Sequence, residues 1–144
     1  METNTDHIIS VKDLVKKYNN GSVTALDHCS LDVKEGQVIA IIGPSGSGKS
    51  TLLRSLNLLE EPTSGRIFFK GTALTSKEVD INKHRQKMGM VFQHFNLFPH
   101  KTVLENITMA PVTLKIQTEE EAKKAAMKLL ERVGLAEKAD EYPN

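Results

Sequence analysis

Residues 43–51 read GPSGSGKST and directly follow an apolar run, VIAII, at residues 38–42. They match the pattern G-x-x-x-x-G-K-[ST], whose glycines let the backbone turn and approach an anion closely. This pattern indicates a phosphate-binding loop when it lies between a buried strand and a helix. Here the apolar run precedes it, and leucines at helical spacing follow it as far as Leu59. The stretch therefore predicts an α/β fold with a phosphate-binding loop at a strand-to-helix turn.

The residues of this loop suit a nucleoside triphosphate with Mg²⁺. Gly43, Gly46 and Gly48 permit turns that point amide N–H groups inward, and the helix beginning beside Lys49 adds the positive end of its dipole. Lys49 brings a full charge to the outer phosphates, and Ser50 is the expected Mg²⁺ ligand. The candidate binding set comprises Gly43, Pro44, Ser45, Gly46, Ser47, Gly48, Lys49, Ser50 and Thr51. The loop alone does not specify the base.

Composition narrows the classes of partner. The chain has 144 residues, about one domain, and its net charge of +1 gives no reason to expect nucleic acid as a ligand. Cys29 is the single cysteine, so no internal disulfide is expected, and it should pack in a sheet as a small apolar residue. The start of the sequence lacks the apolar core of a signal peptide, and no apolar run reaches the roughly 20 residues of a bilayer span.

Hydrophobic periodicity predicts strands in the first part of the chain and helices in the second. Strands are expected at residues 8–17, 23–33, 38–42, 66–70 and 87–92, with one helix at 50–59. A short helix is expected at 102–109, ended by Pro111. A longer helix is expected at 118–133, where Thr118 and Glu121 form a capping box and Gly134 supplies the stop.

Two longer stretches carry a resemblance to a known family. Residues 15–67 read VKKYNNGSVTALDHCSLDVKEGQVIAIIGPSGSGKSTLLRSLNLLEEPTSGRI, and residues 87–107 read KMGMVFQHFNLFPHKTVLENI. Together they closely resemble the ATP-binding subunit of ABC importers, in the polar amino acid uptake branch. The resemblance implies a P-loop NTPase core with an antiparallel β-layer at residues 1–92, and a Q-loop with the start of a helical subdomain at 93–144. It also implies ATP and Mg²⁺ as cofactors.

The resemblance assigns further site residues. Tyr18 would stack on adenine with Val23 beside the same ring; from spacing alone, Tyr18 reads as an ordinary tyrosine at a strand-turn junction. Gln93 would be the Q-loop glutamine that reaches toward Mg²⁺ and the attacking water, although an isolated Gln after a strand is usually a solvated loop residue. Lys49 and Gln93 are then the catalytic candidates, and Ser50 and Gln93 the metal ligands.

The stretch FNLFPH raises the question of partners. Phe95, Leu97, Phe98 and Pro99, just before His100, are unusually apolar for a loop, so they either return to the core or meet another protein. The resemblance implies that this region receives the transmembrane permease. It also implies two further partners: a second ATP-binding subunit and, indirectly, a periplasmic or lipid-anchored amino acid-binding protein. The implied location is peripheral, on the cytoplasmic face of the cell membrane.

The family pattern continues beyond what this sequence contains. No LSGGQ signature, no strand ending in the magnesium-binding Asp and catalytic Glu, and no switch histidine follow YPN. We therefore expect a truncated ATP-binding subunit of an amino acid importer, or alternatively a hydrolysis-deficient remnant that binds nucleotide or permease. A small-molecule P-loop kinase is more remote, because a kinase has no reason to carry QHFNLFPHKTVLENI.

Overall fold

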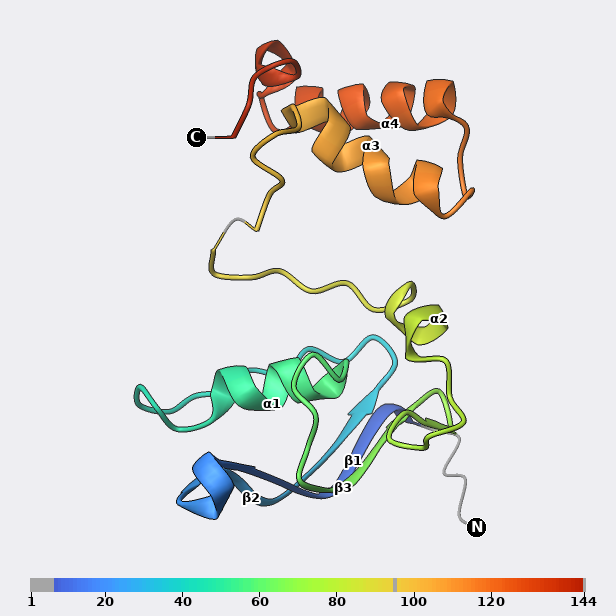
Figure 1. The fold of residues 1–144 in the computed structure, drawn as a ribbon. Coiled ribbons are helices and arrows are strands. Elements are labelled where there is room, and N and C mark those ends of the chain that lie inside the picture. Colours follow the sequence, from blue (N-terminus) through green and yellow to red (C-terminus); the bar gives the residue numbers. More distant parts are fainter. Residues whose placement is uncertain (1–6, 95, 144) are drawn as a thin grey trace. The chain divides into compact units, whose positions relative to one another are not determined.

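The computed structural model describes residues 7–94 and 96–143, which fall into two compact units (Figure 1). The first unit, Met1–Met90, holds β1 (His7–Tyr18), β2 (Val23–Lys34), α1 (Lys49–Leu56), β3 (Ser64–Phe69), β4 (Thr72–Ala73) and α2 (Ile81–Arg85). The second, Val91–Asn144, holds α3 (Val103–Thr113) and α4 (Glu119–Arg132). Short 3-10 turns lie at Asn19–Gly21 and Ala136–Lys138. No helix within the described ranges is long and apolar enough to cross a bilayer.

The first unit is built on an antiparallel sheet in the order β2-β1-β3-β4. The strands predicted at 8–17, 23–33 and 66–70 are confirmed, and Cys29 is half-buried in β2 as expected. Leu52 and Leu56 of α1 pack against the core of the sheet. The buried residues of that core are Val11, Leu14, Leu26, Ile67, Phe69 and Leu74. This core fixes α1, the helix that follows the phosphate loop, against the sheet.

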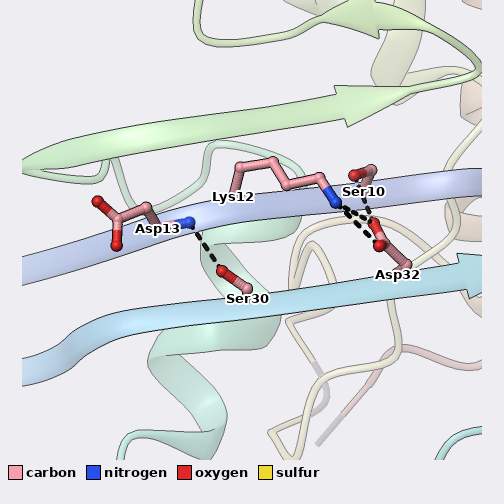
Figure 2. Close-up of polar contacts among 5 residues, drawn as sticks. All are labelled: Ser10, Lys12, Asp13, Ser30 and Asp32. Carbon is pink, nitrogen blue, oxygen red and sulfur yellow. Dashed lines mark hydrogen bonds and ion pairs between the residues drawn. The ribbon is translucent and has the colours of Figure 1, made fainter. Parts of the chain in front are cut away.

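Polar side chains join β1 to β2 (Figure 2). The Ser10 hydroxyl and the Lys12 ammonium both donate to the Asp32 carboxylate, and they hold the pKa of Asp32 below its ordinary range. The Asp13 amide donates to Ser30 Oγ at 3.0 Å, where β1 takes a positive φ of 53°. The pairing register shifts between Val11 and Leu14, so β1 is bulged at this point.

The predictions of strands at residues 38–42 and 87–92 are wrong. In residues 7–94 and 96–143, neither 38–42 nor 87–92 pairs with another strand. Val38 and Ile42 are almost fully exposed, and so is Val91. The reason is that a strand needs neighbours as well as an apolar run, and the described sheet supplies none beside these segments.

The phosphate-loop helix ends earlier than predicted, at Leu56 rather than at residue 59. Leu58 has a positive φ of 53°, which takes the chain out of the helical region. The Arg85 side chain donates from Nε to the Asn57 carbonyl at 3.0 Å and from Nη2 to the Leu58 carbonyl at 2.9 Å. A guanidinium distant in the sequence thus satisfies two carbonyls that lie just past the end of the helix.

In the second unit, α4 follows the prediction closely. Thr118 and Glu121 form both bonds of the capping box, and Gly134 has a positive φ of 72° just after the helix. Ala122, Ala126 and Leu130 are buried along one face. These features are local, because each involves residues within one or two helical turns.

The end of α3 was predicted wrongly, because the helix includes Pro111 and continues to Thr113. Proline removes its own N–H bond, but the Leu114 amide still donates to the Ala110 carbonyl at 3.0 Å. At the other end, the Val103 and Leu104 amides donate to the carbonyls of Glu141 and Ala139. The first turn of α3 is therefore anchored by the end of the described chain.

Candidate functional site

The phosphate loop turns directly into α1 at Gly48, whose φ of 86° makes it a left-handed N-cap. A Cβ added here would lie 2.3 Å from the Ala25 carbonyl oxygen, so the loop packs against β2 at a distance that only glycine permits. Gly46 also has a positive φ, of 80°, but a Cβ at that position would meet nothing within 4 Å. Gly43 faces the Ser47 hydroxyl, which a Cβ would meet at 2.7 Å. The three glycines therefore serve different needs of one tight turn.

The Lys49 ammonium is held by the loop itself. Nζ lies 2.8 Å from the Gly43 carbonyl, 2.7 Å from the Pro44 carbonyl and 3.3 Å from Ser47 Oγ. These acceptors are uncharged, and a charged phosphate oxygen is the stronger partner for an ammonium group. A triphosphate at the loop would therefore compete well for Lys49.

The N-terminus of α1 supplies further donors. The first-turn amides at Lys49, Ser50 and Thr51 have no acceptor within the helix, and the Gly48 N-cap offers no side chain to satisfy them. Ser50, the second residue of α1, is solvent-exposed. Its hydroxyl fits one position around Mg²⁺, an ion that usually takes few protein ligands and completes its shell with phosphate oxygens and water. The donor set thus suits an anion with an associated magnesium ion.

Tyr18 and Val23 face each other across the turn that joins β1 to β2, as paired residues in the register. Tyr18 is half-buried and Val23 is exposed. The Lys16 ammonium lies 4.9 Å from the centroid of the Tyr18 ring and 2.9 Å from Glu60 Oε1. The Lys16 hydrogen bond holds the pKa of Glu60 below its ordinary value.

The sequence interpretation missed Lys16 and Glu60. The available signal for Lys16 was its spacing from Tyr18, because residues i and i+2 of a strand share a face. Nothing in the sequence pointed to Glu60, which comes from the connection after α1.

The remaining predicted site residues belong to the second unit. Gln93 is exposed at a bend, and its predicted role at Mg²⁺ stays a prediction. Phe95 lies outside the described residues. Leu97 and Phe98 are both exposed, and the Phe98 ring makes an edge contact with His100. Within this unit, these apolar side chains do not return to a core.

Asn106, from the first turn of α3, holds the backbone of this loop. Its Oδ1 accepts from the Phe98 amide at 2.8 Å. Its Nδ2 lies within donor distance of the carbonyls of Phe98, Lys101 and Thr102, at 3.2, 3.0 and 2.9 Å. The sequence interpretation also missed Asn106, since no local pattern links it to a residue eight positions earlier.

Comparison with known proteins accords with this geometry. The ABC transporter family model matches residues 26–144. The arginine transport ATP-binding protein ArtM of Bacillus subtilis is 51% identical over 137 residues, which cover 95% of this chain and 56% of that protein. The glutamine transport ATP-binding protein GlnQ of the same organism is 49% identical over 137 residues, with the same coverage of 95% and 56%. The chain thus spans little more than half the length of these curated relatives.

A solved structure shares the fold. The ATP-binding cassette MJ0796, in a dimeric post-hydrolysis state bound to ADP and Pi, matches with a TM-score of 0.84 at 36% identity. The match covers 94% of this chain and 62% of that chain.

Proposed function

Because the chain belongs to the ABC transporter family, we propose that it binds Mg·ATP as part of a subunit that couples ATP hydrolysis to the import of a polar amino acid. The observation that carries this proposal is the glycine-lined turn into α1, with the Lys49 ammonium at its carbonyls and the unpaired amides of the first helical turn beside it. A loop of this kind binds the phosphates of a nucleotide through backbone donors and one mobile charge.

The similar proteins support both the nucleotide and the transported class. ArtM and GlnQ are named for the transport of arginine and glutamine, two polar amino acids. MJ0796 holds ADP and Pi in its solved structure. In this chain, Tyr18 would stack on the adenine with Val23 beside it, and Ser50 with Gln93 would ligate Mg²⁺. Lys49 would also stabilise charge on the transferred phosphoryl group.

We propose that the partners are a transmembrane permease and a second ATP-binding subunit, with an amino acid-binding protein acting indirectly. Leu97 and Phe98 support a permease contact, because they are exposed on a backbone that Asn106 holds in place. The subunit would then lie peripherally on the cytoplasmic face of the cell membrane.

Isothermal titration of Mg·ATP into the 144-residue chain tests the binding step. Lys49→Ala should abolish measurable binding, because it removes the mobile charge from the outer phosphates. Lys77→Ala is the matched control, since Lys77 is exposed and lies outside the loop. Equal affinities of the wild type and Lys49→Ala would contradict the proposal. Phosphate release by the same proteins distinguishes a hydrolysing protein from one that only binds nucleotide.

A further inference from the structure

Lys16 is much less exposed than the other lysines that form ion pairs in the described part of the chain. Its side chain is only 14% exposed, whereas the lysines of the other described ion pairs, Lys12, Lys83 and Lys138, are at least half-exposed. Its ammonium has three partners: Glu60 Oε1 at 2.9 Å, the Glu61 carbonyl at 2.7 Å and the face of the Tyr18 ring at 4.9 Å from the centroid. A lysine with so little exposure needs partners of this kind.

The segment that holds Lys16 is itself fixed in place. The Thr63 amide donates to the Val15 carbonyl at 2.8 Å, and the Lys17 amide donates to Thr63 Oγ1 at 2.9 Å. The Glu60 amide donates to the Arg54 carbonyl of α1 at 3.2 Å. Lys16 therefore joins the Tyr18 ring to the connection that follows the phosphate-loop helix.

We propose that Lys16 is a positioning residue for the nucleotide base: it holds the Tyr18 ring against its ammonium and leaves the opposite face of the ring to stack on adenine. This inference rests on the proposed function, which places adenine at Tyr18. The cation stabilises the ring in one orientation before the base arrives, so less ordering remains to be done on binding. Lys16 acts through Tyr18 and needs no contact with the nucleotide.

A different result is expected if the Lys16 ammonium lies on the face of the Tyr18 ring that binds the base. If the ammonium occupied the face on which the base must stack, the nucleotide would have to displace it. Removal of the lysine would then strengthen ATP binding.

Titration of two probes separates these cases. Mg·ATP carries the base, and Mg·tripolyphosphate carries only the phosphates. We expect Lys16→Met, which keeps the aliphatic stem and removes the charge, to weaken ATP binding about 3- to 10-fold and to leave tripolyphosphate binding unchanged. Lys16→Arg should bind ATP with nearly the affinity of the wild type, because a guanidinium can stack on the ring and pair with Glu60. In a Tyr18→Ala background, Lys16→Met should have no further effect on ATP.

Equal losses for the two probes would overturn the inference, because Lys16 would then act on the phosphates or on the fold. Tighter ATP binding by Lys16→Met, or unchanged affinity, would overturn it as well. Denaturation midpoints identify variants that fail to fold. If Lys16→Met does not fold, Glu60→Gln decides the question: a loss confined to ATP supports the inference, and no loss contradicts it. Failure of the proposed function looks different, because the wild type would then bind neither probe.

Discussion

A Cβ atom added at Gly48 would lie 2.3 Å from the carbonyl oxygen of Ala25, far inside van der Waals contact. The contact joins the N-cap of the phosphate-loop helix to β2, so the position of the loop relative to the sheet depends on the absence of a side chain. The same residue also has a φ of 86°, which other residues adopt only with strain.

Gly48→Ala should therefore destabilise the fold far more than Gly46→Ala. The Gly46 substitution introduces only the left-handed conformation, at a cost of about 1–2 kcal/mol. At Gly48 the clash with the backbone adds to this strain, and we expect a total of roughly 3 kcal/mol or more. Urea denaturation of both variants measures the difference in the free energy of unfolding. Equal losses in the free energy of unfolding would show that the backbone of β2 shifts to accommodate the new Cβ at little energetic cost.

The stability of the first unit should depend on pH through His28. Its Nδ1 lies 2.7 Å from Asp13 Oδ1, and this hydrogen bond raises the pKa of His28 above its ordinary value of 6.5. The folded state thus binds the proton more tightly than the unfolded state. The resulting stabilisation is complete below pH 6.5 and is lost as the pH rises through the folded pKa.

Asp13→Asn is the matched test of this pair. Asp13 has a φ of 53°, and asparagine tolerates that conformation while removing the charge. NMR titration should find the pKa of His28 lower in the variant than in the wild type. The fall in urea midpoint between pH 6 and pH 8 should be smaller in the variant. Both side chains are largely exposed. If the pKa of His28 were the same in the variant and the wild type, the pair would not persist in solution.

Asn106→Asp should destabilise the second unit by roughly 1–3 kcal/mol. The substitution replaces Nδ2, which faces three backbone carbonyls, with an oxygen that cannot donate to them. Asn20→Asp is the control, because Asn20 is exposed in a turn and should change stability by less than about 0.5 kcal/mol. Thermal denaturation measures both. Similar small effects at the two positions would show that the loop does not depend on Asn106.

The predictable features of this chain are the local ones. The capping box of Thr118 and Glu121 involves residues three positions apart, and the turn at Gly48 belongs to one continuous motif. Their chemistry can be recognised from residue types and spacing alone.

Several of the missed features depend on partners distant in the sequence. Arg85 donates to the Asn57 carbonyl just after α1 from 28 positions away, and Glu60 pairs with Lys16 across a separation of 44 residues. Hydrophobic periodicity contains no information on such contacts. The same limit explains residues 38–42, whose composition suits a buried strand although no described neighbour pairs with them.

The exposed segment at residues 38–42 should make the 144-residue chain self-associate. Val38 and Ile42 are 95% and 93% exposed, and unpaired backbone groups beside apolar side chains form a template for pairing with another chain. Replacing both with threonine keeps the β-branched shape and removes apolar area, so Val38→Thr/Ile42→Thr should lower the oligomer fraction several-fold.

Ile116→Thr is the control, because Ile116 is also exposed but lies outside this segment, in the connection between α3 and α4. Light scattering over a range of protein concentrations should show assembly of the wild type and of Ile116→Thr, and much less assembly of the double variant. A wild-type chain that stays monomeric at every concentration would contradict the prediction. If Ile116→Thr reduced assembly as strongly, general surface hydrophobicity rather than pairing at residues 38–42 would be responsible.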